Sequence, residues 1–264
     1  MHKNSVNLSV DDRGVAHICL NRPQKHNAIN EQMLDDITKF CQTLPLHTRL
    51  VLITATGKNF CAGADLQWMQ QQFTATRTQR LQQSAKLANM LQLLDQLAVP
   101  VISMVQGAVY GGGLGILAVS DRVVATRDTQ FCFSEVLLGL IPATIGPFVY
   151  AKAGNALRAC FLTAQPFDVT LAQRLNLVTD IVAASELQQA MTTNIDQALK
   201  CDGAAAARAK TLLRTFGTTG STDNFHQHSI EALADCWQQP TTMQRIASFL
   251  ERKQSVKGRE SGQE

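Results

Sequence analysis

The alternation of short apolar runs with helical patterns constrains the fold of this chain more than any other feature of its sequence. Three runs, Leu50 to Thr54, Pro100 to Gln106 and Arg122 to Ala125, are short and largely apolar, as buried strands are. Around them stand helical patterns, one from the capping residue Asn30 to about Leu44 and a long amphipathic one over about 76–97. Strands that alternate with helices predict an α/β core.

The two ends of the chain depart from this alternation. Val6 to Val10 and Val15 to Leu20 alternate apolar and polar residues around a turn, which predicts a strand, a turn and a second strand. From about Ala204 onward only helical patterns occur, and so short a segment cannot hold a core without docking on something else. We therefore expect a core of residues 1–199 and a C-terminal helical region of residues 200–264. The helices predicted for that region are Ala204 to Phe216, Thr222 to Trp237 and Thr241 to Arg252.

Composition and charge exclude several classes of protein. The net charge of +3 comes from 24 basic and 21 acidic residues, most of them spread along the chain, which argues against a nucleic-acid-binding surface. The seven cysteines are odd in number and include no Cys-x-x-Cys pair, which indicates reduced thiols. The sequence has no apolar run long enough to cross a bilayer and no apolar segment of a secretory signal near Met1. We expect a cytoplasmic protein that does not enter a membrane.

A glycine run, YGGGLG at residues 110–115, lies between the strand that ends at Gln106 and a helix that begins near Gly112. Glycines at this place leave backbone N–H groups uncovered at a helix N-terminus, where the helix dipole favours negative charge. The run therefore predicts either an anion or oxyanion site, or a tight turn that packs closely against a neighbouring segment. It does not match the dinucleotide-binding pattern G-x-G-x-x-G, because Ile116 occupies the last required position.

A second corner that contains glycine, Asn59 to Asp65, follows the strand Leu50 to Thr54. Two such corners, each placed after a strand, could direct two backbone N–H groups at one oxygen atom. A pair of donors of this kind is what a developing enolate requires. The residues alone therefore suggest a site that stabilises negative charge on an oxygen.

Glu135 stands among apolar residues and is the main candidate for acid–base chemistry. A buried carboxyl group without partners destabilises a protein, so catalysis or a salt bridge must account for this residue. Desolvation would raise its pKa toward the range in which a general base works. Other reactive side chains are weaker candidates. Cys61 has no motif that supplies an activating histidine, and His226 and His228 have no nearby ligand cluster, so we predict no metal site.

Several ordered motifs resemble those of the crotonase, or enoyl-CoA hydratase/isomerase, superfamily, and together they cover nearly the whole chain. They are ICLNRPQKHNAIN (Ile18 to Asn30), FCAGADL (Phe60 to Leu66), PVISMVQGAVYGGGLGILAVSD (Pro100 to Asp121), FCFSEVLLGLIPATIGPFV (Phe131 to Val149) and IASFLERK (Ile246 to Lys253). The resemblance implies an α/β spiral of ββα units with a C-terminal helical trimerisation region. It also implies a homo-oligomer, a trimer or a dimer of trimers, that acts on acyl-CoA thioesters. Coenzyme A would then arrive as part of the substrate, and no cofactor would be bound permanently.

The resemblance also assigns roles to residues by position. It implies that the N–H groups of Ala64 and Gly112 hold the thioester oxygen, and that Glu135 moves protons. It further implies that the coenzyme A path is lined by Lys25, Ala28, Ala62, Asp65 and Leu66.

One expected carboxylate is missing. Hydratases of this superfamily often hold a water molecule between two glutamates, and the first of these positions is Gly115 in this chain. With Glu135 alone, the protein could add water across the 2,3 double bond of an enoyl thioester. It could instead be an isomerase with Glu135 as its sole proton shuttle, or a non-catalytic scaffold that binds coenzyme A or RNA.

The residues around the glycines and Glu135 look most like those of bacterial 3-methylglutaconyl-CoA hydratases and the related isohexenylglutaconyl-CoA hydratases. These enzymes act in leucine and acyclic-terpene breakdown, so the resemblance favours hydration of a branched glutaconyl-CoA with a distal carboxylate. A basic or hydroxyl group should meet that carboxylate. Tyr110, Arg77 and Arg80 are candidates, although solvation on the surface of the long helix also accounts for both arginines.

Overall fold

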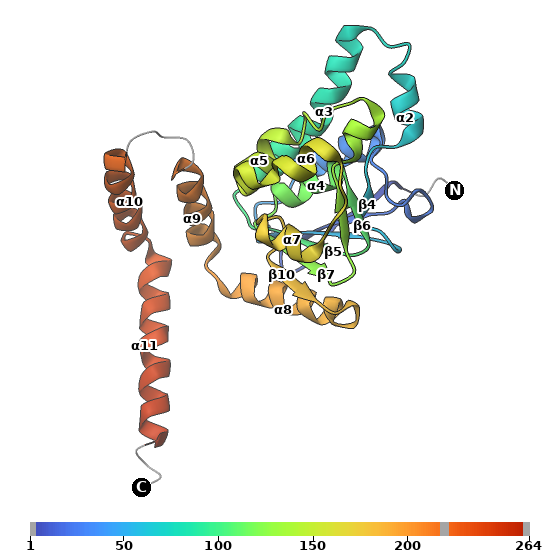
Figure 1. Cartoon of the computed structure of the whole chain (residues 1–264). Coiled ribbons are helices and arrows are strands. Elements are labelled where there is room, and N and C mark those ends of the chain that lie inside the picture. Colours follow the sequence, from blue (N-terminus) through green and yellow to red (C-terminus); the bar gives the residue numbers. More distant parts are fainter. Residues whose placement is uncertain (1–3, 217–221, 261–264) are drawn as a thin grey trace. The chain divides into compact units, whose positions relative to one another are not determined.

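The computed structural model describes residues 4–216 and 222–260, with side chains for residues 4–216 and 226–251 (Figure 1). The chain divides into two compact units, residues 1–203 and residues 204–264. Within the described ranges, no helix combines the length and the apolar character needed to span a bilayer.

The first unit is built on a six-stranded sheet with the strand order β1-β2-β3-β5-β7-β10. β1 runs antiparallel to β2, and the other neighbouring strands are parallel. The strands are β1 (Val6–Val10), β2 (Val15–Leu20), β3 (Leu50–Ala55), β5 (Val101–Val105), β7 (Arg122–Thr126) and β10 (Asp180–Val182). The strands predicted from the apolar runs and from the N-terminal alternation are confirmed, with only small differences at their ends.

Helices cover both faces of this sheet. They are α1 (Glu31–Gln42), α2 (Leu66–Gln71), α3 (Arg77–Gln96), α4 (Gly112–Ala118), α5 (Gly146–Ala153), α6 (Arg158–Thr163), α7 (Val169–Arg174) and α8 (Leu187–Lys200), with the 3-10 helices η1 (Pro23–Lys25), η2 (Ser134–Leu138), η3 (Gly154–Leu157) and η4 (Ala184–Glu186). Asn30 caps α1 as predicted, because its side-chain oxygen accepts a 3.1 Å hydrogen bond from the N–H of Met33. The helix predicted over 76–97 is confirmed as α3, but its apolar face does not run along its whole length. Its buried residues, Met90, Leu91 and Leu94, all lie in the C-terminal half.

The central strands of the sheet are buried on both sides, because helices pack on both faces. Alternate residues of a strand point to opposite faces and so enter different cores. On β3, Val51 and Ile53 join the large core that α1, α3 and α4 complete. Leu50 and Leu52 face the other way, into a smaller core that includes Ile195 of α8. Figure 1 accordingly shows α8 on the side of the sheet opposite to α4, α5 and α6.

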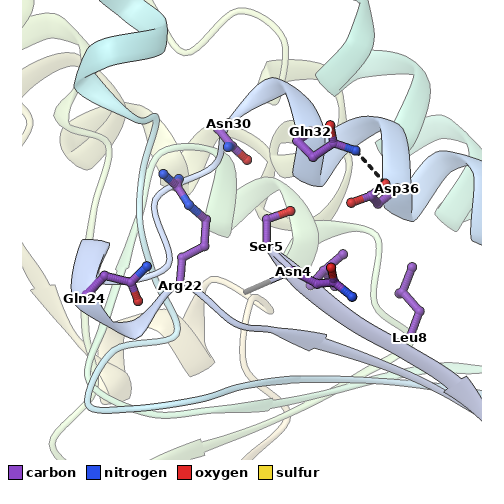
Figure 2. A pocket seen from close by; sticks show the side chains of 9 residues that line it. Asn4, Ser5, Leu8, Arg22, Gln24, Asn30, Gln32 and Asp36 are labelled. Atoms are coloured by element: carbon purple, nitrogen blue, oxygen red, sulfur yellow. Dashed lines mark hydrogen bonds between the residues drawn. The ribbon is translucent and has the colours of Figure 1, made fainter. Parts of the chain in front are cut away.

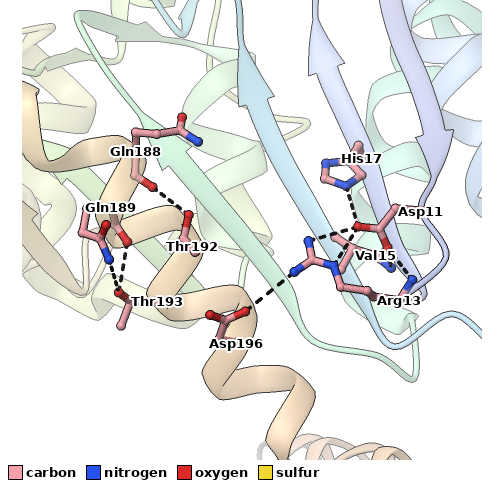
Figure 3. A network of polar contacts seen from close by, with 9 residues as sticks. All are labelled: Asp11, Arg13, Val15, His17, Gln188, Gln189, Thr192, Thr193 and Asp196. Atoms are coloured by element: carbon pink, nitrogen blue, oxygen red, sulfur yellow. Dashed lines mark hydrogen bonds and ion pairs between the residues drawn. The ribbon is translucent and has the colours of Figure 1, made fainter.

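A polar network also links α8 to the turn between β1 and β2 (Figure 3). Arg13 Nη2 lies 3.1 Å from Asp11 Oδ2, and Arg13 Nη1 lies 3.7 Å from Asp196 of α8. His17 Nε2 lies 3.6 Å from the same Asp11 oxygen. Exposed ion pairs of this kind stabilise a fold by about 0–1 kcal/mol each. The apolar contacts of Ile195 therefore contribute more to holding α8 on the sheet.

A second, smaller sheet positions the candidate site. Its strands are β4 (Cys61–Ala62), β6 (Ala108–Tyr110), β8 (Gln130–Cys132) and β9 (Phe167–Asp168). β4, β6 and β8 are parallel and in register, with Ala62 opposite Tyr110 and Tyr110 opposite Cys132. The segments that follow these three strands therefore leave the sheet side by side. These segments carry Ala64, Gly112 and Glu135.

The second unit is helical, as predicted. Its helices are α9 (Gly203–Phe216), which begins at the last residue of the first unit, α10 (Thr222–Trp237) and α11 (Pro240–Glu260). α11 is longer than the predicted helix, which ended at Arg252. Large apolar side chains of this unit are exposed: Leu213, Phe216, Ile230, Leu233, Trp237, Met243, Ile246, Phe249 and Leu250.

Candidate active site

A pocket of about 500 Å³ lies where β4, β6 and β8 end. The segments after the three strands contribute Gly63 and Ala64, Gly111 and Gly112, and Ser134 and Glu135 to its wall. The remaining lining residues are mostly apolar and come from five other segments: Ile29, Ala62, Leu66, Trp68, Met69, Ser84, Leu87, Leu138, Leu140, Ile141, Ala143 and Thr144. The register of the small sheet thus brings together the three residues predicted to be catalytic.

The Ala64 amide is held in a fixed orientation. Ile29 N–H donates to the Gly63 carbonyl at 2.8 Å, and Asp65 N–H donates to the Ile29 carbonyl at 2.8 Å. Within a trans peptide unit, the carbonyl and the N–H of the next residue point in opposite directions. The Ala64 N–H therefore points away from Ile29, and it has no hydrogen-bond partner among the described residues.

The Gly112 amide is fixed in a similar way. Leu114 N–H donates to the Gly111 carbonyl at 2.9 Å, so the Gly112 N–H of the same peptide unit points in the opposite direction. Gly112 is the first residue of α4, and its N–H also lacks a partner within the described part of the chain. Gly111 has a φ of +48°, a conformation that favours glycine.

Close packing is a second reason for glycine in this run. A Cβ atom at Gly112 would lie 2.8 Å from Ile29 Cδ1, and a Cβ at Gly113 would lie 2.8 Å from Cys61 Cβ. The two interpretations left open by the sequence are therefore compatible. The glycines pack closely against their neighbours, and they leave one amide without a partner.

Glu135 supplies the only carboxylate among the described residues that line the pocket, and no lysine, arginine or histidine lines it. Its Oε2 atom is buried and has no hydrogen-bond partner in the described structure. Its Oε1 atom lies 3.1 Å from the position that a Cβ of Gly111 would occupy, so the carboxyl group lies against the glycine corner. Burial raises the pKa of Glu135 above its ordinary value. A carboxylate in this setting can accept a proton and return it.

The position of the missing first glutamate is filled by apolar side chains. Gly115 is buried and does not line the pocket. A Cβ atom there would lie 2.6 Å from Ile145 Cγ2 and 2.8 Å from Leu91 Cδ1. The space that a side chain at 115 would need is thus already occupied.

The residues predicted to line the coenzyme A path fall into two groups. Ala62 and Leu66 line the pocket, whereas Lys25, Ala28 and Asp65 do not. Asp65 is buried, and its carboxylate is engaged by Arg22 and by two backbone amides at the start of α2. These hydrogen bonds engage both oxygens of the Asp65 carboxylate.

The candidates for a distal carboxylate also lie outside this pocket. Tyr110 and Arg77 line neither it nor the neighbouring pocket. Arg80 lines that neighbouring pocket, which has a volume of about 660 Å³ and shares Trp68, Met69, Ser84 and Leu140 with the first. The Arg80 guanidinium donates to two backbone carbonyls, Gln72 O at 2.9 Å and Phe73 O at 3.2 Å.

Several lining residues were missed by the sequence reading. Leu87 and Leu91 lie one helical turn apart on α3, the first in the pocket and the second behind it against Gly115. That spacing is a signal that the sequence contains. Trp68 forms part of the wall between the two pockets, and its indole N–H donates to Gln83 Oε1 at 3.1 Å. No sequence pattern pairs these two residues.

Among the described residues, no group of three or more histidine, cysteine, aspartate or glutamate side chains could hold a metal ion.

The chain is similar to known proteins over most of its length. The family model for enoyl-CoA hydratase/isomerase matches residues 11–258. The chain is 31% identical over 213 residues to the enoyl-CoA isomerase/hydratase fer4 of Mycosarcoma maydis, covering 73% of this chain and 76% of that protein. It is 29% identical over 225 residues to the enoyl-CoA hydratase AFT6-1 of Alternaria alternata, with 83% and 74% covered.

A solved structure shows the same architecture. The enoyl-CoA hydratase from Shewanella pealeana superposes with a TM-score of 0.88 at 34% sequence identity, over 94% of each chain. The match to the family model over most of the chain and the shared architecture lead to one conclusion: the chain belongs to the enoyl-CoA hydratase/isomerase, or crotonase, family.

Proposed function

We propose that the protein is an enoyl-CoA hydratase with Glu135 as its sole acid–base group. The observation that carries the proposal is the buried Glu135 carboxyl group, whose Oε2 has no partner in the described structure, in one pocket with two unpartnered amides. The N–H groups of Ala64 and Gly112 bind the thioester oxygen. They stabilise the negative charge that develops there.

The reaction follows from these positions. Glu135 takes a proton from water as the water oxygen bonds to C3 of the enoyl chain. The electrons of the 2,3 double bond move toward the thioester carbonyl, and the resulting enolate oxygen is held by the two amides. Glu135 then returns the proton to C2, which restores the thioester and the carboxylate. One carboxyl group is sufficient because it acts first as a base and then as an acid.

For the substrate, we propose 3-methylglutaconyl-CoA or a related branched glutaconyl-CoA. The pocket is lined by apolar side chains and holds no cation that could bind a distal carboxylate. Arg80 lines the adjoining pocket. Among the described residues, its guanidinium donates two hydrogen bonds, both to backbone carbonyls. A guanidinium with further N–H donors can bind a carboxylate. The substrate chain would therefore run past Trp68 toward Arg80.

A second candidate, an enoyl-CoA isomerase, is favoured by the filled space at Gly115. Ile145 and Leu91 occupy that space, so Glu135 alone would orient a water molecule. Isomerisation needs no bound water, because one carboxylate takes a proton from one carbon and delivers it to another.

Hydration and isomerisation are separated by one assay. Purified wild-type protein and Glu135→Gln are mixed with 3-methylglutaconyl-CoA or crotonyl-CoA, and loss of the conjugated enoyl-thioester absorbance is followed. The proposal predicts water addition that favours the branched substrate and that slows by about 10²- to 10⁴-fold in Glu135→Gln. Failure to hydrate either thioester, together with conversion of 3-enoyl-CoA esters to conjugated ones, would identify an isomerase. Activity that survives in Glu135→Gln contradicts both, and binding without any reaction would indicate a non-catalytic scaffold.

The arginine in the adjoining pocket allows a separate test of the substrate. Arg80→Gln should raise KM for 3-methylglutaconyl-CoA and leave KM for crotonyl-CoA unchanged, because only the first carries a distal carboxylate. Arg77→Gln is the matched control, since Arg77 starts the same helix and lines neither pocket. Equal effects of Arg80→Gln on both thioesters would remove the support for a glutaconyl substrate.

We also propose that the protein works as a homo-oligomer in the cytoplasm. The exposed apolar side chains of α9 to α11 support the assembly, because a surface of this kind is usually covered by another protein. The seven cysteines are all free, which supports a reducing compartment.

A further inference from the structure

We propose that Arg22 is a positioning residue for the Ala64 amide and that it acts through Asp65 and the Ala28 carbonyl. The proposal rests on the proposed function, because the Ala64 N–H is one of the two donors that would bind the thioester oxygen.

The orientation of the Ala64 N–H depends on where Ile29 lies. The Gly63 carbonyl is held by the N–H of Ile29, and the Asp65 N–H is held by the carbonyl of Ile29. If the segment around Ile29 moved away, the peptide unit between Gly63 and Ala64 could rotate. Gly63 has a φ of +91° and no side chain to resist such a rotation. A rotated unit would present a carbonyl oxygen, not an N–H group, to the thioester.

One guanidinium joins the two segments that flank this amide. Arg22 Nη1 donates to the Ala28 carbonyl at 2.6 Å, and Arg22 Nη2 donates to Asp65 Oδ2 at 2.6 Å. Ala28 precedes Ile29, and Asp65 follows Ala64. The side chains of Arg22 and Asp65 are only 14% and 6% exposed, so water competes little for these bonds. The planar fork of arginine suits such a double contact, which a lysine ammonium cannot reproduce with the same geometry.

Arg22 is itself held in place. Its backbone N–H donates to Asn27 Oδ1 at 2.7 Å, and the Asn27 amide group donates to the carbonyls of Thr56 and Asn59, each at 2.8 Å. Asn27 is fully buried. On its other side, the guanidinium end of Arg22 lies beside Asn30, where both residues line a separate polar pocket (Figure 2).

Asp65 connects the clamp to the pocket wall. Its Oδ1 accepts a 2.8 Å hydrogen bond from Gln67 N–H and a 3.4 Å bond from Trp68 N–H at the start of α2. Burial acts to raise the pKa of Asp65, but the hydrogen bonds from Arg22 and from the two amides outweigh it and hold that pKa below the ordinary value. The carboxylate is therefore charged at neutral pH.

The proposal makes a kinetic prediction. Arg22→Gln should lower kcat by about tenfold to a hundredfold, because a misplaced donor loses much of its effect on the transition state. KM should change far less, because the Asp65 carboxylate still accepts the Gln67 and Trp68 amides that hold the start of α2 and so the pocket wall. Arg22→Lys should fall between Arg22→Gln and wild type. Asp65→Asn should resemble Arg22→Gln, and the two changes together should lower kcat by less than the product of their separate effects.

A spectroscopic measurement tests the amide directly. Cinnamoyl-CoA is bound to Glu135→Gln protein, which should not consume it, and its absorbance maximum is compared with that in water. Hydrogen-bond donors on the thioester oxygen polarise the conjugated chain and move the maximum to longer wavelength. The red shift should be present in Glu135→Gln and largely lost when Arg22→Gln is added. Arg122→Gln is the matched control and should leave the shift intact. Arg122 also pairs with an aspartate, Asp180, at 2.8 Å, but it lies on β7 and lines none of the pockets around the site.

The outcomes separate this proposal from the proposed function. A full red shift in the Arg22→Gln protein overturns the positioning role, and so does the absence of any shift with probe bound, because there would be no donor to position. A shift that depends on Arg22 in a protein that neither hydrates nor isomerises enoyl-CoA leaves the positioning role intact and overturns the proposed reaction. Thermal unfolding checks that each variant is folded, and Arg22→Lys with Asp65→Asn replaces Arg22→Gln if that variant does not fold.

Discussion

Glu135 carries the one carboxyl group among the described residues that line the pocket, and the space that a side chain at Gly115 would need is filled. Ile145 follows two residues that line the pocket, and Leu91 lies one turn after Leu87, so both apolar side chains that fill the space at Gly115 are just behind the wall. The wall behind the site is therefore apolar, and burial raises the pKa of the one carboxyl group in front of it. A second carboxylate at 115 would need both the space and a partner, and the described structure offers neither.

The packing at Gly115 predicts a loss of stability on a small substitution. Gly115→Ala should lower the free energy of unfolding by about 1–3 kcal/mol, because the new Cβ would lie within 3 Å of two buried side chains. Urea denaturation measures the change. Gly146→Ala is the control, since a Cβ there would lie 3.7 Å from its nearest neighbour, and it should be neutral or stabilising by up to about 1 kcal/mol. Equal stability of Gly115→Ala and wild type would mean that Ile145 and Leu91 can move aside.

The raised pKa of Glu135 predicts the pH at which activity is lost on acidification. The base must be ionised to take a proton, so kcat/KM should fall as the pH drops through its pKa. Because burial raises that pKa, the midpoint of the fall should lie above the ordinary value of 4.5. A profile of kcat/KM against pH measures it. A midpoint at or below 4.5 would contradict the desolvated environment assigned to this residue.

The same shift predicts how stability depends on pH. A carboxyl group whose pKa is raised by folding favours the folded state below its unfolded pKa, and this contribution is lost as the pH rises through the folded pKa. Glu135→Gln has no charge to desolvate, so it should be at least as stable as wild type at pH 7. Any advantage should shrink below pH 4.5. Thermal unfolding at pH 7 and below pH 4.5 compares the two proteins. A Glu135→Gln variant that is less stable than wild type at pH 7 would contradict a raised pKa for Glu135.

Among the elements of the fold, five strands of the large sheet, β1, β2, β3, β5 and β7, and the cap of α1 were predictable because their patterns are local. Each run of five or six apolar or alternating residues is long enough to show its period, and Asn30 precedes a clear helical pattern. The two glycine corners were predictable for the same reason. The short strands β4, β6, β8 and β10 were not, because two or three residues cannot show a period.

The rest of the site depends on contacts between distant segments. Arg22 and Asp65 are 43 positions apart, and no local sequence pattern around either residue predicts their contact. Ile145, the N-cap residue of α5, fills the space at Gly115 from another part of the chain. The sequence indicated that position 115 lacks the glutamate that the resemblance implies, but only the packing shows that Ile145 and Leu91 fill the space.

The capping box at the start of α3 should stabilise the first turns of this helix. Thr76 accepts a hydrogen bond from Gln79 N–H, and Gln79 Oε1 accepts one from Thr76 N–H, which together form a capping box. Thr76→Ala should destabilise the protein by about 0.5–2 kcal/mol and speed amide hydrogen exchange in the first turns of α3, where no side chain is fully buried. Thr78→Ala, inside the same helix, should be neutral or slightly stabilising because alanine favours helix. Similar exchange in both variants would mean that the cap does not hold this end.

The assembled protein should depend on the exposed apolar side chains of the C-terminal helices. Leu233→Asp should dissociate the proposed oligomer, because Leu233 is 63% exposed and would place a charge in an apolar contact. Sedimentation equilibrium should then give a mass near the 28.8 kDa of one chain, against a multiple of it for wild type. Ala234→Asp is the control, since the next residue of a helix points about 100° away. A wild-type mass of one chain would contradict the proposed assembly.

Proton transfer by Glu135 is the step on which the proposed hydration depends, and solvent deuterium reports it because the proton that Glu135 delivers to C2 comes from water. Wild-type protein and Glu135→Gln are incubated with enoyl-CoA thioesters in D₂O, and deuterium entering the acyl chain is measured by mass spectrometry. The account predicts rapid incorporation by the wild type and a rate lower by about 10²- to 10⁴-fold in the folded Glu135→Gln variant. Incorporation at the wild-type rate by Glu135→Gln would show that another group moves the proton, and would contradict the assignment of Glu135.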